Sequence, residues 1–447
     1  MSKSYWIETW GCQMNEHDSE KIAGTLQGLG YSPAESSHDA DVVLLNTCAI
    51  REKAEDRVYQ ALGELAPLKK RRPGMIIGVC GCVAQMSGES IRQRAPIVDL
   101  VMGPRASIKL PELLARLQDE RGIVDTTLYQ ESILAGTESV RRMPGRVKAF
   151  VTIMEGCNKT CTYCIVPTTR GREDSRTLEV VLNEVRRLAD EGYREVEFLG
   201  QNVNAWRCAE TKAGLGDLLR AAARVDGIAR IRFTTSHPLH LSDAIIDAMA
   251  TTPEVCRYMH LPVQSGSDRL LNAMRRGYDR ARFMGRVAKL REAMPDIVLS
   301  TDVIVGFPGE TDEDFDKTIQ LVKEVEFENI FSFLYSARPG TVAAMMLDSV
   351  SAERKTERLM QLQSLQREIQ LRRHAALVGS HHCVLVEGTS RRDESEWAGR
   401  TTSNKVVNFA GTGIGVGDLV EVRITAGGPN SLRGEMVVRP DSASPAA

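Results

Sequence analysis

The centre of the chain repeats one kind of structural unit. From Ala149, apolar strand-like runs alternate with amphipathic helix-like stretches, which gives six units over about 190 residues. The expected strands are residues 149–156, 195–203, 230–236, 258–264, 298–307 and 329–335. A complete barrel of this type needs eight units, so six units predict a partial, open (β/α)6 barrel. Its functional residues are expected at the C-terminal ends of the strands.

Both flanks of this region have their own patterns. Residues 3–120 alternate short apolar strands with amphipathic stretches, which predicts a Rossmann-like parallel α/β domain. From residue 379, expected strands over 382–388, 397–409, 417–426 and 432–439, between Gly- and Asn-rich turns, predict a small, closed, OB-like β-barrel. We therefore divide the chain into an N-terminal domain (3–120), a linker (121–147), the partial barrel with a connecting helix over 351–378 (148–378), a β domain (379–440) and a disordered tail (441–447).

Composition limits the environment and the partners. The 447 residues contain no apolar run of the ~20 residues that a membrane helix needs, and the first ten residues lack the features of a secretory signal. We expect a cytoplasmic monomer that binds no membrane. The formal net charge of −2 neither favours nor excludes a polyanionic partner. Ten cysteines in a reducing compartment indicate metal or cluster binding, catalysis or burial rather than disulfides.

Three cysteines follow the first expected barrel strand with the spacing C-x3-C-x2-C. Cys157, Cys161 and Cys164 could wrap one face of a [4Fe–4S] cluster, which normally takes four cysteines. Three ligands leave one iron open, which is useful where a substrate or cofactor binds the metal directly. The alternative is a zinc site or a set of buried thiols. Structural zinc sites usually have four ligands, and no histidine lies in the loop.

Three further cysteines are dispersed but occupy equivalent positions. Cys12, Cys48 and Cys82 each lie at the end of an expected strand of the N-terminal domain. The C-terminal ends of neighbouring parallel strands lie side by side, so the three thiols should converge and provide a second set of three ligands. The alternative is independent burial. We interpret Cys80, Cys208, Cys256 and Cys383 as structural thiols, and the pair His237 and His240 as part of a loop.

With these residues in view, the chain resembles a known family. The segment EGCNKTCTYCIVPTTRG (155–171) resembles the cluster loop of radical S-adenosylmethionine enzymes. The segments around Cys12, Cys48 and Cys82 narrow the resemblance to the methylthiotransferases. FLGQNVNAW (198–206) and VPTTRG (166–171) are most similar to the branch that acts on N6-(dimethylallyl)adenosine in tRNA. The β domain resembles a TRAM domain, an RNA-binding module.

The resemblance implies two [4Fe–4S] clusters and S-adenosylmethionine as cofactors. It assigns Cys157, Cys161 and Cys164 to the cluster that binds S-adenosylmethionine, and Cys12, Cys48 and Cys82 to an auxiliary cluster. The S-adenosylmethionine contacts that it implies are Tyr163, Gln201, Gln264, Ser265, Asp302 and Ile304. Basic residues around the cluster loop and in the β domain give the candidate RNA contacts Arg146, Arg170, Arg172, Arg400 and Lys405, although a solvated basic surface is the alternative.

The implied reaction is methylthiolation of carbon 2 of N6-(dimethylallyl)adenosine at position 37 of tRNA. No acid–base pair can functionalise that C–H bond, whereas a radical made from S-adenosylmethionine can. The implied partners are the tRNA anticodon loop, whose unpaired bases are accessible, an electron donor such as flavodoxin, and a sulfur or cluster carrier. Alternatives are a sister enzyme acting on threonylcarbamoyladenosine in tRNA or on a ribosomal protein aspartate, and a non-catalytic two-cluster electron carrier with an RNA-binding domain.

Overall fold

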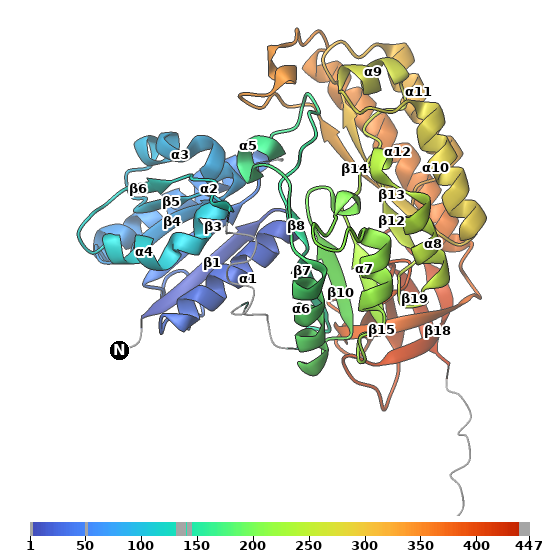
Figure 1. Ribbon diagram of the computed structural model, residues 1–447, viewed down its shortest axis with the longest axis horizontal. Helices are drawn as coiled ribbons and strands as arrows, with labels where there is room; N and C mark the ends of the chain where they lie inside the picture. Colours follow the sequence, from blue (N-terminus) through green and yellow to red (C-terminus); the bar gives the residue numbers. More distant parts are fainter. Residues whose placement is uncertain (1–2, 50–51, 131–139, 141–144, 438–447) are drawn as a thin grey trace, which may run out of the picture.

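The computed structural model describes residues 3–49, 52–130, 140 and 145–437 (Figure 1). The N-terminal domain lies beside the central barrel, and the β domain lies at one end of that barrel. The three parts have the architecture expected from the sequence: a parallel α/β domain, a partial barrel and a closed five-stranded β-barrel. The tail predicted at 441–447 lies outside the described residues.

The N-terminal domain has a six-stranded parallel sheet in the order β2-β1-β3-β4-β5-β6. Its strands are β1 (Ser4–Trp10), β2 (Ser32–Pro33), β3 (Val42–Thr47), β4 (Ile76–Gly81), β5 (Leu100–Met102) and β6 (Ile123–Asp125). Its helices are α1 (Gln13–Gly28), α2 (Glu52–Arg71), α3 (Cys82–Arg94) and α4 (Leu110–Arg116). Alternate residues of β3 enter two core clusters, Val43 and Leu45 in one and Val42 and Leu44 in the other, as expected for a sheet buried on both faces.

This sheet extends further along the chain than we predicted. Strand β6 pairs in parallel with β5, yet Ile123–Asp125 falls in the segment that we assigned to the linker. Three residues are too few to show the period of a strand, so the pattern could not reveal it. Part of the same segment, residues 131–139 and 141–144, lies outside the described residues.

Six parallel strands form the central barrel as two three-stranded sheets, β11-β10-β7 and β12-β13-β14, joined by a parallel bridge between Ile231 and Val255. The strands are β7 (Lys148–Thr152), β10 (Glu195–Leu199), β11 (Arg230–Phe233), β12 (Tyr258–His260), β13 (Val298–Val305) and β14 (Asn329–Leu334). The helices are α5 (Val166–Arg170), α6 (Leu178–Asp190), α7 (Leu215–Ala222), α8 (Asp243–Thr251), α9 (Asp268–Ala273), α10 (Arg280–Ala293) and α11 (Asp312–Val325). In the described part of the chain β7 and β14 do not pair, so the barrel is open between them.

The long helix α12 (Ala352–Ala375) connects the barrel to the β domain, and the Ser351 hydroxyl caps it by accepting from the Arg354 amide. The β domain closes in the order β15-β16-β17-β19-β18. Its strands are β15 (His381–Thr389), β16 (Trp397–Thr401), β17 (Val406–Ala410), β18 (Leu419–Gly427) and β19 (Leu432–Met436). We expected one strand over 397–409, but Asn404 adopts φ +66° and turns the chain into a hairpin.

The β domain covers the N-terminal ends of the barrel strands. Arg230, the first residue of β11, donates to the carbonyl oxygens of Arg400 (2.5 Å) and Cys383 (2.8 Å). Arg232 donates to the carbonyls of Thr401 (2.7 Å) and Thr402 (2.9 Å). The β domain is therefore fixed at the end of the barrel opposite the C-terminal strand ends. None of the helices in the described ranges combines the length and the apolar character needed to span a bilayer.

Candidate functional site

Cys157, Cys161 and Cys164 lie in the loop between the short strand β8 (Met154–Glu155), which pairs with β9 (Asp174–Ser175), and helix α5. Gly156 opens the loop with φ +77°, and a Cβ there would lie 2.1 Å from the Arg172 carbonyl oxygen. Only glycine fits this position. Within the loop, the Lys159 amide lies 3.4 Å from the Cys157 sulfur, and the Cys164 amide donates to the Cys161 carbonyl at 3.0 Å.

A cavity of about 230 Å³ opens over this loop at the C-terminal ends of the barrel strands. It is lined by all three cysteines and by five of the six side chains that we predicted to contact S-adenosylmethionine: Tyr163, Gln201, Gln264, Asp302 and Ile304. Ser265 does not line it. This side chain is fully buried, lies 3.4 Å from the Thr318 hydroxyl and accepts from the Ser267 amide, so its predicted contact has no support in the structure.

Several buried polar atoms of the cavity wall lack a hydrogen-bond partner. Within the described ranges they are Gln264 Oε1, His237 Nε2, Ser236 Oγ and Tyr335 Oη. A buried polar atom without a partner costs about 1–3 kcal/mol, so four around one cavity indicate that a polar ligand completes them. The cavity therefore fits a cofactor with amino, carboxylate and hydroxyl groups beside the three thiols.

Two of the lining side chains are held in place by neighbours. The Gln201 Oε1 atom accepts from the Gly156 amide at 2.5 Å, which connects the end of β10 to the cysteine loop. The Asp302 carboxylate on β13 meets His260 Nε2 at 3.0 Å. Gln264 has φ +74° and bridges to β13 through its backbone. These contacts fix the orientation of side chains that come from three different strands and loops.

Arg276 is a functional candidate that the sequence did not reveal. Its guanidinium is buried and lies 3.5 Å from the Cys161 sulfur and 3.2 Å from the Tyr163 hydroxyl. His237, which we placed in a plain loop, also lines the cavity, and burial together with the charge of Arg276 lowers its pKa to about 2. Both residues are far from the cysteines in the chain and belong to no local motif, so no pattern pointed to them.

Burial keeps the thiols of Cys157 and Cys164 protonated in the absence of a metal. It raises the pKa of Cys164 to about 12 and also raises that of Cys157. Thiolate, not thiol, is the metal ligand, so loading of this loop must release protons.

The N-terminal cysteines lie at the ends of three adjacent strands. Cys12 follows β1 and caps α1, Cys48 follows β3, and Cys82 begins α3 directly after β4. A hydrogen bond with Cys48, opposed by burial and aided by the charge of Arg170, lowers the pKa of Cys12 to about 6. A Cβ on Gly11 would lie 2.9 Å from the Cys48 Cβ, so a glycine is needed for this close approach.

Cys80 belongs to a different face of the sheet from Cys82. It packs with Leu44, Leu100 and Met102, whereas Cys82 packs with Val79 and Val83. Burial raises the pKa of Cys80 to about 12. Cys80 is therefore a core thiol, and it points to the other face of the sheet than we expected.

The described residues contain no group of three His, Cys, Asp or Glu side chains placed around one point as a single metal ion requires. A cubane cluster does not need that geometry. Each cysteine binds a different iron, so the three sulfurs surround a volume rather than a point.

The two sets of cysteines share one interface. Ile165, the residue after Cys164, packs in the same apolar cluster as Cys82. Cys12 packs against Phe150 and Leu199 of the barrel strands β7 and β10. Helix α5 also lies against α3, as Figure 1 shows. The cysteine loop of the barrel and the strand ends of the N-terminal domain therefore face each other.

The candidate RNA contacts divide into two groups. Arg146 and Arg172 are exposed, and Arg400 is half-buried and pairs with Glu387 at 3.2 Å. Arg170 is 2% exposed and Lys405 is 7% exposed, and each forms an ion pair, with Asp18 and Glu328 respectively. The prediction that Arg170 and Lys405 bind RNA is wrong, because neither side chain reaches the surface.

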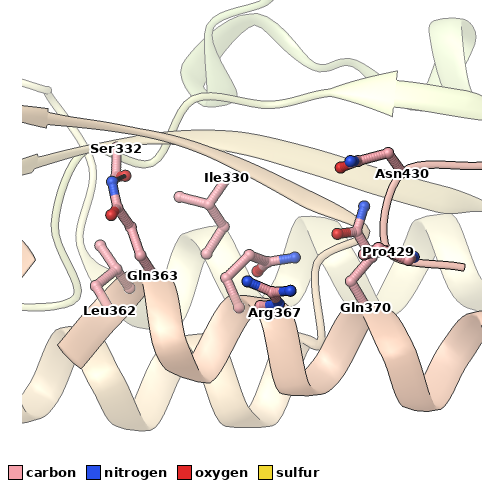
Figure 2. Close-up of a pocket in the computed structure, with 9 residues that line it drawn as sticks. Ile330, Ser332, Leu362, Gln363, Arg367, Gln370, Pro429 and Asn430 are labelled. Carbon is pink, nitrogen blue, oxygen red and sulfur yellow. Dashed lines mark hydrogen bonds between the residues drawn. The ribbon is translucent and has the colours of Figure 1, made fainter. Parts of the chain in front are cut away.

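A second cavity, of about 300 Å³, lies where α12 and β14 meet the turn between β18 and β19 (Figure 2). Gln363, Arg367 and Gln370 of α12 lie along one side, with Asn430 of the turn opposite. It contains none of the cysteines and none of the residues that we predicted from the sequence.

Comparisons with known proteins agree with this geometry. Residues 4–103 match an uncharacterized protein family, UPF0004, residues 151–322 match the radical SAM superfamily, and residues 375–437 match the TRAM domain. Among solved structures, the radical S-adenosylmethionine methyltransferase TsrM from Kitasatospora setae, with cobalamin and a [4Fe-4S] cluster bound, has a TM-score of 0.58 at 16% identity over 77% of each chain. At that identity the likeness concerns the fold alone.

Two relatives are similar over nearly their whole length. The tRNA-2-methylthio-N(6)-dimethylallyladenosine synthase of Methylococcus capsulatus is 50% identical over 443 residues, which cover 98% of this chain and 96% of the relative. The synthase of the same name from Alteromonas mediterranea is 49% identical over 450 residues, with 98% and 93% covered. The chain therefore belongs to the family of the tRNA-2-methylthio-N(6)-dimethylallyladenosine synthases, radical SAM transferases.

Proposed function

We propose that the chain transfers a methylthio group to carbon 2 of N6-(dimethylallyl)adenosine at position 37 of tRNA. The observation that carries the proposal is its near full-length identity, at half of all positions, to synthases named for this product. The geometry supports it, because a cavity built for a polar cofactor lies next to a second set of three thiols.

Radical SAM enzymes use S-adenosylmethionine and a [4Fe–4S] cluster, which Cys157, Cys161 and Cys164 would hold. When bound, these two groups supply a carbon radical, which is reactive enough to activate an aromatic C–H bond. We assign a second [4Fe–4S] cluster to Cys12, Cys48 and Cys82. The low pKa of Cys12 supports this assignment, because a thiol that ionises near neutral pH is a ready metal ligand.

The protein's own side chains would bind the cofactor and orient it in the cavity. Gln201 holds the cysteine loop against β10. The buried side-chain oxygen of Gln264, Oε1, has no partner within the described protein and would accept a hydrogen bond from the cofactor. Asp302, fixed by His260, offers a carboxylate for a hydroxyl or amino group. Burial of the Gln264 side chain helps to exclude water from this part of the cavity.

We propose that tRNA approaches along the open side of the barrel, beside β14. Phe331 and Leu334 on that strand are 41% and 40% exposed, and Leu334 also lines the cavity. Exposed aromatic and apolar side chains suit unstacked bases and a dimethylallyl group. The exposed Arg146 and Arg172 stay candidates for phosphate contacts.

Two further partners follow from the chemistry. The radical reaction consumes electrons one at a time, so we propose a one-electron donor such as flavodoxin. The sulfur that leaves with the product must be replaced, so we also propose a sulfur or cluster carrier. Cys12, Cys157 and Cys164 are half-buried, so each set of cysteines has at least one thiol with some exposure to such partners.

The test is anaerobic reconstitution with iron and sulfide, followed by incubation with S-adenosylmethionine, a reductant and tRNA that carries dimethylallyladenosine without the methylthio group. Mass spectrometry of the nucleosides should show one added methylthio group on that adenosine. A control variant, Cys157→Ala/Cys161→Ala/Cys164→Ala, should give none and should retain about half of the iron. Modification of threonylcarbamoyladenosine, or of a ribosomal protein, would contradict the proposal.

The electron-carrier alternative has a spectroscopic test. If the open iron binds S-adenosylmethionine, adding it to the reduced protein should alter one electron paramagnetic resonance signal. An unchanged spectrum would favour the carrier.

A further inference from the structure

Arg170 belongs to the barrel but points into the N-terminal domain. It ends α5, six residues after Cys164, and its side chain is 2% exposed. Its Nη2 atom donates to Asp18 Oδ2 on α1 at 2.6 Å, and its Nη1 atom lies 3.7 Å from Glu155 Oε1. Arg170, on the helix that follows the cysteines of the barrel, therefore reaches α1, the helix that Cys12 caps.

The same guanidinium also acts on the N-terminal thiols. It lies within hydrogen-bonding reach of the Cys82 thiol, and its charge acts on Cys12 as well. In each set of cysteines one buried arginine therefore approaches a sulfur: Arg276 at Cys161 and Arg170 at Cys82. Arg170 differs from Arg276 because the arginine and the cysteine belong to different domains: Arg170 lies in the barrel and Cys82 in the N-terminal domain.

Arg170, Asp18, Glu155 and Arg105 form a buried network of charges, and a gain in folding stability does not explain why it is buried. Arg105 of the N-terminal domain completes it, 3.7 Å from Glu155 and bonded to the Arg172 carbonyl at 3.0 Å. All four charged side chains are at least nine-tenths buried. Removing charges from water costs several kcal/mol for each ion, and apolar residues of similar size often stabilise as well or better. A fixed relative position of charges is what such a network provides.

We propose that Arg170 is the positioning residue of the second cluster, supplied to the Cys12, Cys48 and Cys82 site by the barrel. Three thiolates outweigh the charge of an oxidised [4Fe–4S] core, so the loaded site is anionic and becomes more so on reduction. A cation beside it favours the reduced state and holds the site against the loop of Cys164. This inference rests on the second cluster of the proposed function.

The experiment measures the reduction potential of that centre alone. The parent is the full chain with Cys157→Ala/Cys161→Ala/Cys164→Ala, reconstituted anaerobically and titrated while electron paramagnetic resonance is recorded. Into it are placed Arg170→Gln, Arg170→Lys and, as the matched control, Arg105→Gln, which disturbs the same network without touching a cysteine. The double variant Arg170→Gln/Asp18→Asn removes the cation together with its anionic partner, so no carboxylate is left unpaired, and it covers the case in which the single variant does not fold.

We expect Arg170→Gln to lower the reduction potential and to weaken iron retention by 10–100-fold, as loss of an outer partner of a metal ligand does. The double variant should change both in the same direction but by less, because the anion of Asp18 is lost with the nearer cation. Arg170→Lys should restore most of the potential, and Arg105→Gln should leave it near the parent value. An unchanged potential in the double variant, or an equal change with Arg105→Gln, overturns the inference and leaves the proposed function intact. A parent without any iron–sulfur signal overturns both.

Discussion

Glu328 joins three parts of the molecule at one carboxylate. It lies just before β14, meets His374 of α12 at 2.7 Å and Arg373 at 3.1 Å, and pairs with Lys405 of the β domain. Burial alone would raise its pKa, but His374 and Lys405 outweigh burial and lower the pKa to about 2. We predict that Glu328→Gln weakens the attachment of the β domain to the barrel without breaking the contacts of Arg230 and Arg232.

The pKa shift sets the size of the effect. The pKa of Glu328 falls from 4.5 to about 2, and at about 1.4 kcal/mol for each unit this gives an upper value of ~3.5 kcal/mol. Burial lowers the pKa of Lys405, which offsets part of the gain, so we expect a net loss of about 2 kcal/mol. Because the folded pKa is depressed, the stabilisation is complete above pH ~4.5 and is lost as the pH falls toward ~2.

Hydrogen exchange followed by mass spectrometry measures this local stability at pH 7. Peptides of β16 and β17 should exchange about 30-fold faster in Glu328→Gln, whereas peptides of the N-terminal sheet should not change. In a double-mutant cycle with Lys405→Met, the two substitutions should lose less together than the sum of their separate losses. Equal protection of the β domain in the variant and the parent, or strict additivity in the cycle, would refute the reasoning.

Three further outcomes follow from the site. Gly156→Ala should abolish iron binding by the cysteine loop without unfolding the protein, because the added Cβ meets the Arg172 carbonyl; iron analysis and circular dichroism measure both. Cys80→Ala should keep full iron content and activity, whereas Cys82→Ala should lose the second centre; the reverse result would exchange their roles. Arg276→Met should shift the potential of the S-adenosylmethionine-binding centre to lower values, as spectroelectrochemistry can detect, and an unchanged potential would contradict a role at Cys161.

The fold could be predicted from the sequence because it depends on local patterns of residues. Apolar periods and turn residues predicted the parallel α/β domain, the partial barrel and the closed β-barrel, and all three are present. The predicted strand bounds were wrong in two places, where the pattern was too short or continued without a visible break. Strand β6 has three residues, and the hairpin of β16 and β17 looks like one strand unless the left-handed Asn404 is known.

Charged residues were the part that the sequence could not place. Arg170 pairs with Asp18, 152 residues away, and Arg276 reaches Cys161 from 115 residues away. An arginine beside a cysteine loop looks the same in sequence whether it faces RNA or a buried carboxylate. Only the packing of two domains decides between these outcomes. The cofactor roles of Gln201, Gln264 and Asp302 stay predictions, although these residues line the same cavity as the three loop cysteines.

The β domain covers the N-terminal ends of the barrel strands, and the thiols lie at their C-terminal ends. The length of the strands therefore sets the distance between the β domain and the thiols. Strand β13 has eight residues, which at ~3.3 Å each span about 26 Å between the end that the β domain covers and the end that carries the thiols. If the β domain binds the tRNA, the nucleotide that reaches the thiols must lie about one barrel length from that contact. Shortening or lengthening the barrel, rather than altering the cavity, would then change which adenosine along the strand is chosen.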